Sequence, residues 1–75
     1  MTETIRNYIG NLLDMELAEK QELLSSGLID SITIMKLVAY LEETYSVKVP
    51  AQDMIIENFN TVESISKYVS TRIKE

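Results

Sequence analysis

Apolar residues recur at helical spacing in three stretches of this 75-residue chain. The first stretch predicts an amphipathic helix over residues 3–13, because its apolar side chains share one face. These side chains are those of Ile5, Tyr8, Ile9, Leu12 and Leu13. Thr2 is the expected N-cap, since a threonine oxygen can accept a backbone N–H of the first turn.

Residues 14–29 interrupt this spacing, because their apolar residues are sparse and irregular and Ser25-Ser26-Gly27 supplies turn chemistry. We expect a long connection with one short helical piece near residues 16–24. A loop of this length in a small domain needs a reason. Four apolar side chains are expected to hold it against the core, namely those of Leu23, Leu24, Leu28 and Ile29.

The helical spacing returns at residue 30. Asp30 stands at the N-cap position, where its carboxylate can accept the N–H of Ile32 or Thr33. Ser31 is then the first helical residue, and the pattern fades at residues 44–48. The side chains expected to face the core are those of Ile34, Leu37, Val38, Leu41 and Tyr45.

Pro50 prevents a helix from continuing across it. Val47 and Val49, just before it, are therefore expected to anchor a loop to the core. Residues 51–58 are predicted to form one short helix.

A last helix is predicted to run to about Lys74. Asn60, followed three residues later by Glu63, resembles a capping box at its start. Its apolar face consists of Val62, Ile65, Tyr68, Val69 and Ile73. The prediction is an all-α four-helix bundle, three helices longer and one short, in a single domain over residues 1–75, since so short a chain supports one core.

Twelve acidic and seven basic residues give a net charge of −5. This charge repels nucleic-acid phosphates and anionic membrane surfaces, so neither is expected as a partner. Residues 14–30 are the most acidic segment, with five acids against Lys20 alone. Such a segment is either a solvated loop or a surface for a basic partner.

The chain contains no cysteine, which excludes disulfides and thiolate ligands and is typical of a reducing, cytoplasmic location. Its longest apolar run, residues 37–41, is far shorter than a membrane span, and no signal sequence is visible. We therefore expect a soluble, unprocessed monomer without membrane insertion.

Ser31 lacks the partners that a catalytic serine needs. The chain has no histidine, so a Ser-His-Asp triad is impossible, and no lysine stands out as a buried base. The acids of residues 14–22 lack the glycine and ligand order of a calcium loop, and two glycines form no phosphate-binding loop. We expect no catalytic residue and no metal site, and Ser31 is expected to be acted upon by another protein.

The outward side of the second predicted helix carries an apolar patch with a charged rim beside Ser31. Such a patch is typical of a docking surface, although Ile32 and Met35 could instead cover the long loop. The patch and its rim consist of Ile32, Met35, Lys36, Ala39, Glu42 and Glu43.

These features together resemble the acyl and peptidyl carrier proteins, over nearly the whole chain. Asp-Ser followed by an aliphatic residue is common by chance. Its place at the head of an amphipathic helix, in a short acidic chain with the Glu42-Glu43 pair, makes the combination specific. The matching residues are Leu24, Gly27, Asp30-Ser31-Ile32, Val49-Pro50 and Thr61-Val62.

The resemblance implies that a phosphopantetheinyl transferase attaches the 4′-phosphopantetheine of coenzyme A to Ser31, yielding a phosphoprotein. Asp30 would cap the helix and help the transferase to recognise the site. The thiol of this arm would carry acyl or aminoacyl groups as thioesters between enzymes. The implied partners are the transferase, a loading enzyme (an adenylating ligase or an acyltransferase) and a downstream synthase or transferase.

The chain departs from fatty-acid-type carriers, which commonly show Gly-x-Asp-Ser followed by acids. Here two residues separate Gly27 from Asp30, and Thr33 and Lys36 occupy usual acidic positions. This favours a free-standing carrier of a dedicated biosynthetic pathway, with aminoacyl, aryl, polyketide or D-alanyl cargo. A fatty-acid-synthesis acyl carrier protein stays an alternative, as does an unmodified acidic helical adaptor that binds a partner protein.

Overall fold

Four α-helices and one 3-10 turn make up the computed structural model, which describes residues 1–73 and has no strand among them. The helices are α1 (Thr2–Leu13), α2 (Ser31–Tyr45), α3 (Ile56–Phe59) and α4 (Val62–Arg72), and the 3-10 turn is η1 (Ala51–Asp53). The predicted all-α bundle with three longer helices and one short helix is therefore confirmed. The predicted end of the last helix at Lys74 lies outside the described residues.

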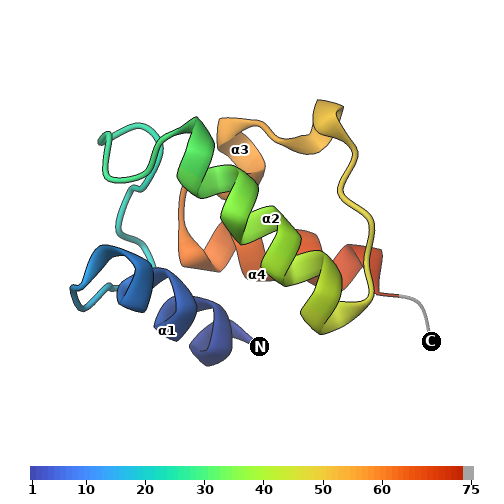
Figure 1. Cartoon of the computed structure of the whole chain (residues 1–75), viewed down its shortest axis with the longest axis horizontal. Helices are drawn as coiled ribbons and strands as arrows, with labels where there is room; N and C mark the ends of the chain where they lie inside the picture. The colour runs from blue at the N-terminus through green and yellow to red at the C-terminus, as the bar shows by residue number, and fades with distance from the viewer. Residues whose placement is uncertain (74–75) are drawn as a thin grey trace.

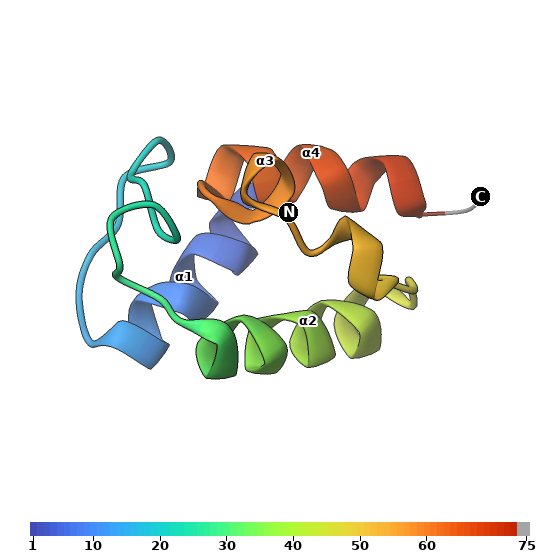
Figure 2. The same cartoon turned by 90° about the horizontal axis from the view of Figure 1, so that it is seen from above.

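The helices enclose the core from several sides. α2 and α4 lie on opposite sides of the molecule, and α1 lies between them near the end where both begin (Figures 1 and 2). The long connection between α1 and α2 covers that same end. Within residues 1–73, no helix has the length and apolar character that crossing a bilayer would require.

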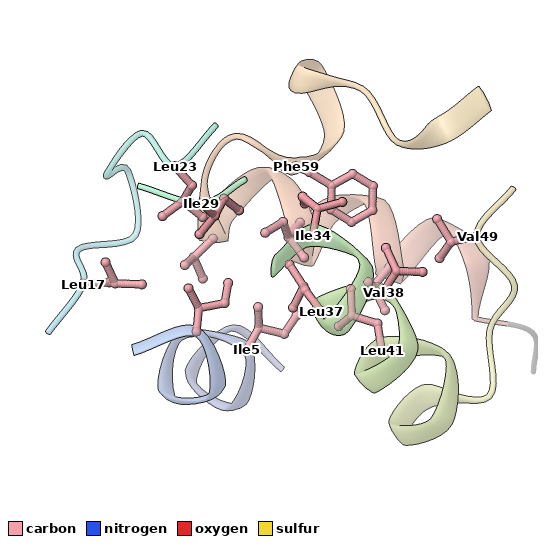
Figure 3. Packing of buried hydrophobic residues seen from close by; sticks show 14 of the residues in the cluster. Ile5, Leu17, Leu23, Ile29, Ile34, Leu37, Val38, Leu41, Val49 and Phe59 are labelled. Atoms are coloured by element: carbon pink, nitrogen blue, oxygen red, sulfur yellow. The ribbon is translucent and has the colours of Figure 1, made fainter. Parts of the chain in front are cut away.

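One core joins the apolar faces of all four helices (Figure 3). Leu37 and Leu41 of α2 are fully buried, and Phe59 brings α3 against the same cluster. The loops contribute as predicted, since Leu23 and Ile29 are buried in the long connection and Val47 and Val49 are buried before Pro50. The other buried hydrophobic residues of the helices are Ile5, Ile9, Ile34, Val38, Val62, Ile65 and Val69.

The short helical piece predicted near residues 16–24 is wrong, because this segment contains only turns, bends and irregular chain. Asp14 ends α1 in the left-handed conformation, with φ 55°. Leu17 and Leu23 then reach the core as separate anchors. The backbone N–H groups of residues 23–25 donate to Asn60 rather than to a helical ladder, so a tertiary contact replaces the local hydrogen bonds that a helix would form here.

The cap predicted for the first helix is also wrong. Thr2 lies inside α1, and Met1 occupies the N-cap position without a side-chain hydrogen bond. The Met1 carbonyl accepts the N–H of Ile5 at 3.1 Å, so the helical ladder starts one residue earlier than the side-chain signal indicated.

Asn60 does not form the predicted capping box. Thr61 is the N-cap of α4, and its hydroxyl oxygen accepts the N–H of Ser64 at 3.0 Å. Asn60 is free for a different role because the residue after it can also cap.

The single helix predicted over residues 51–58 is divided into η1 and α3. Met54 separates them with φ −83° and ψ 65°, outside the helical region. Asp53 is held on both sides, since its carbonyl accepts from Asn58 at 2.8 Å and its carboxylate from Tyr68 at 2.6 Å. The hydrogen bond from Tyr68, which lies in α4, and the local one from Asn58 together favour a turn over a continuous helix.

Candidate functional site

Asp30 caps α2 in the way the sequence predicted. Its backbone is extended, with φ −116° and ψ −172°, and its carboxylate accepts the N–H of Thr33 at 2.9 Å. This hydrogen bond favours the charged form and holds the pKa of the Asp30 carboxyl below its ordinary value. A permanent negative charge therefore stands at the positive end of the helix dipole at neutral pH.

Ser31 is the first residue of α2 and is exposed to solvent. Among the described residues, none forms a hydrogen bond with its hydroxyl. The free amides of the first helical turn lie close to it, and such a helix start favours a nearby anionic group. The hydroxyl is thus accessible, and its residue is held in place as the first residue of a long helix.

A folded loop leads into this helix start. Gly27 has φ +82°, a conformation that glycine adopts without strain, and its N–H donates to the Leu24 carbonyl at 3.1 Å. The N–H of Ile29 donates to the Leu23 carbonyl at 3.1 Å. These contacts close residues 23–29 into a loop that ends one residue before Asp30.

The outward face of α2 presents apolar side chains next to Ser31. Ile32 is 67% exposed and Met35 is 65% exposed, and Ala39 is exposed one turn further along. Ile32 and Met35 therefore do not serve to cover the long loop, which was the alternative interpretation. The loop is instead held against the core by its own side chains Leu23 and Ile29, which are buried.

Three of the predicted rim and patch residues come together in one shallow hollow. Lys36, Ala39 and Glu43 line it with Tyr8 and Tyr40. The two tyrosine rings stack with centroids 3.8 Å apart and planes 9° apart, joining α1 to α2. The sequence indicated Tyr8 only as part of a helix face, because stacking across helices leaves no local signal.

Glu42 differs from the other rim residues. It is half-buried, and its carboxylate accepts the N–H of Val49 at 2.9 Å. This hydrogen bond attaches the connection after α2 to the helix, so Glu42 has a structural contact in addition to its predicted place on the rim.

Ile55 and Ile56 form an exposed apolar pair that the sequence interpretation did not single out. They are 43% and 55% exposed at the start of α3. The signal available was the run Met54-Ile55-Ile56, because a run of consecutive apolar residues on a surface is unusual unless it serves a function.

An exposed serine at the head of the second helix of a small helical bundle is the arrangement that the resemblance to carrier proteins predicts. A family model described as a phosphopantetheine attachment site matches residues 3–69. A D-alanyl carrier protein of Streptococcus suis (strain 98HAH33) is 32% identical over 65 residues, which cover 84% of this chain and 82% of that protein. The chain belongs to the family of phosphopantetheine-bearing carrier proteins, which are carriers rather than enzymes.

The covalent cofactor of this family is 4′-phosphopantetheine, whose terminal thiol carries a cargo as a thioester. The start of α2 fits such a group. The exposed hydroxyl of Ser31 offers an attachment atom, and the helix amides favour the negative charge of a phosphodiester. The hydrogen bond from Thr33 to Asp30 keeps the first turn of α2 ordered. An arm attached to the Ser31 hydroxyl would therefore extend from the protein in a defined direction.

Proposed function

We propose that Ser31 is the attachment residue and that the protein carries acyl or aminoacyl groups on the resulting arm between partner enzymes. The observation that carries this proposal is the exposed, unbonded hydroxyl of Ser31 at the start of α2. A flexible tether fixed at that point keeps one cargo at high effective concentration near each enzyme that docks.

The other serines are poorer candidates. Ser25 and Ser26 donate their hydroxyls to Glu22, and Ser66 is buried. Ser64 and Ser70 engage their hydroxyls in hydrogen bonds along α4. Ser46 is exposed, but it caps the C-terminus of α2, where the helix dipole disfavours a phosphodiester.

Intact-mass measurement tests the attachment residue. The purified chain is incubated with coenzyme A and a phosphopantetheinyl transferase of broad acceptance. The wild type is expected to gain one phosphopantetheine, whereas Ser31→Ala gains none. Ser46→Ala is the matched control, since it removes an exposed serine at the other end of the same helix and is expected to react like the wild type.

A mass gain in Ser31→Ala would assign the arm to another residue. No gain in the wild type, under conditions where a known carrier reacts, would favour the unmodified adaptor instead.

The exposed face of α2 is proposed as the docking surface for the transferase, the loading enzyme and the downstream enzyme. Ile32, Met35 and Ala39 would supply its apolar centre, since they are exposed beside the attachment residue. Exposed apolar side chains at such a place are typical of interfaces that form and dissociate. The charged residues of this surface are Lys36, Glu42 and Glu43.

D-alanine is the cargo that we propose to test first. The relative that matches over 84% of the chain is named a D-alanyl carrier protein. The departures of Thr33 and Lys36 from the fatty-acid pattern also favour an aminoacyl cargo over a fatty acyl chain. The core supports this choice, because Leu37, Leu41 and Phe59 are fully buried against their neighbours, and a charged amino group has no reason to enter it.

The cargo is tested by loading the modified protein with a D-alanine-activating ligase and ATP. We expect a D-alanyl thioester that is visible by mass and released by hydroxylamine, and far less product with L-alanine. Absence of any D-alanyl product, together with efficient loading by a fatty acyl ligase, would favour the fatty-acid-synthesis alternative.

A further inference from the structure

Asn60 joins two parts of the chain that are far apart in the sequence. Its side-chain Oδ1 accepts three backbone N–H groups of the long connection, from Leu23 at 3.2 Å, Leu24 at 2.9 Å and Ser25 at 2.9 Å. The Asn60 carbonyl also accepts the N–H of Leu23, at 2.7 Å. One residue at the junction of α3 and α4 therefore holds three consecutive residues of the loop.

The segment that Asn60 holds is the base of the loop over residues 23–29. The Leu23 carbonyl accepts the N–H of Ile29 at 3.1 Å, and both side chains are buried. Leu23 thus contacts Asn60 through its N–H and Ile29 through its carbonyl. A displacement of Leu23 would therefore displace Ile29 as well.

Ile29 directly precedes the cap and the attachment residue. Only Asp30 separates it from Ser31, so the position of Ile29 fixes the direction from which the chain enters α2. The exposed part of the same loop, residues 25–27, precedes Ser31 by only a few residues in the sequence. A transferase that binds the Ser31 hydroxyl therefore works within a few residues of this loop.

We propose that Asn60 is a positioning residue for the modification of Ser31. It acts through Leu23 and Ile29 and does not touch Ser31 itself. It keeps the loop before the serine in the single arrangement that a transferase can approach. This inference rests on the proposed function, because it presumes that Ser31 is the modified residue.

Residue 60 must present an acceptor oxygen at the distance from its backbone that the Asn60 Oδ1 has, because this atom accepts the N–H groups of the loop. A carbonyl or carboxylate oxygen can accept several N–H groups, whereas an apolar side chain would leave those of Leu24 and Ser25 without this partner. Losing the acceptor frees the loop to adopt other arrangements. The apparent affinity of the transferase for the carrier then falls in proportion to the fraction of carrier molecules whose loop has the arrangement that the transferase binds.

Steady-state kinetics of modification test the proposal, with coenzyme A and the same transferase. We expect Asn60→Ala to raise the KM for the carrier about tenfold with kcat unchanged, the change that losing one or two net hydrogen bonds produces. Asn60→Gln keeps the amide but shifts its oxygen by one methylene, so it should raise KM in the same direction. Asn60→Asp keeps an acceptor in place and should restore KM to within about twofold of wild type.

Amide hydrogen exchange gives a second readout. The amides of Leu24 and Ser25 should exchange faster in Asn60→Ala and Asn60→Gln, while the amides of α2 keep their protection. Unchanged KM in folded Ala and Gln variants would overturn the proposal. Failure of both variants to fold would overturn it too, since Asn60 would then serve the fold as a whole. Failure of the wild type to accept the arm on Ser31 would instead contradict the proposed function.

Discussion

Asp30 and Ser31 are adjacent, but the side chain of Asp30 is hydrogen-bonded within the protein and that of Ser31 is exposed. Asp30 has its carboxylate occupied by the N–H of Thr33, which fixes the first turn of α2. Ser31 has its hydroxyl exposed. Because one side chain satisfies the helix end, the next can leave its oxygen available to an external catalyst. The pair combines local order with accessibility in two adjacent positions.

The charge on Asp30 should make the stability of the protein depend on pH in the acid range. The folded-state pKa of Asp30 is lowered from 3.8, mainly by the hydrogen bond from Thr33. Its contribution is therefore present above about pH 3.8 and is lost as the pH falls through the lower, folded-state pKa. Asp30→Asn should lower Tm at pH 7, and the difference from wild type should shrink below that range.

Thermal unfolding monitored by circular dichroism, from pH 7 to pH 2, measures this difference. Glu57→Gln provides a control, because Glu57 is an exposed acid in the first turn of α3 and is not the N-cap residue of that helix, which is Ile55. A difference between wild type and Asp30→Asn that stays constant over the whole range would contradict the role of the charge.

At the scale of elements, the turn that follows α1 brings the backbone of Met15 close to Gly10. A Cβ at this position would lie 2.7 Å from the Met15 carbonyl oxygen, which is a backbone atom. Gly10→Ala would ordinarily favour a helix by about 1 kcal/mol. Here we expect the free energy of unfolding to fall by about 1–3 kcal/mol, as overpacking does.

Denaturant unfolding of Gly10→Ala, compared with Asn11→Ala, measures this effect. Asn11 is the exposed neighbour of Gly10 in the same helix, so its substitution reports helix propensity without the close contact. A Gly10→Ala variant as stable as Asn11→Ala would show that the turn after α1 can move away freely.

Tyr68 links α4 to η1 and should make the protein sensitive to alkaline pH. Its phenol donates to the Asp53 carboxylate at 2.6 Å. Burial and that carboxylate raise the pKa of Tyr68 from 10.0 to about 12. The stabilising contribution is present below pH 10 and is lost as the pH rises through about 12.

Tyr68→Phe should therefore remove part of the alkaline unfolding transition between these pH values. Tyr45→Phe is the control, because Tyr45 is also half-buried against the core, whereas within residues 1–73 it is Tyr68 whose phenol donates to the Asp53 carboxylate. Absorbance of the tyrosinate at successive pH values follows the titration directly. Equal alkaline profiles for both variants would argue against the hydrogen bond to Asp53.

The elements that the sequence predicted well are those whose information is local. The apolar spacing of α2 and the cap at Asp30 follow from adjacent residues, and both are confirmed. The errors at Thr2, at residues 16–24 and at residues 51–58 have another origin. In the last two segments, the deciding hydrogen bonds come from Asn60 and Tyr68, which are distant in the sequence.

The candidate site divides in the same way. Ser31, Ile32 and Met35 could be placed on an exposed face because helical periodicity assigns directions around one axis. The stacking of Tyr8 on Tyr40 depends on how α1 crosses α2, and the hydrogen bond from Val49 to Glu42 depends on the path of the following loop. Neither can be derived from one element alone.

At the scale of the whole molecule, the chain has a net charge of −5. The proposed docking face nevertheless contains one exposed cation, Lys36. Lys36 is exposed in the hollow with Ala39 and Glu43. A partner that docks there must accommodate this positive charge. Lys36→Glu should reduce kcat/KM for loading by the cognate enzyme by about tenfold, because it places like charges together at the interface.

Loading rates measured at low and high salt test this effect. The difference between Lys36→Glu and wild type should diminish as salt screens the charges. Lys48→Glu is the matched control, since it changes the net charge equally from an exposed position after α2. Unchanged loading of Lys36→Glu, or an equal loss in Lys48→Glu, would count against docking at this hollow.

The hydrogen bonds to Asn60 also set an order of events during protein synthesis. They connect residues that are 35, 36 and 37 positions apart. A nascent chain on the ribosome contains Ser31 well before it contains Asn60, so the loop beside the serine lacks its anchor until the second half emerges. If Asn60 positions this loop as we propose, installation of the prosthetic arm would be deferred until translation has nearly finished, and a fragment that ends before residue 60 would be a poor acceptor.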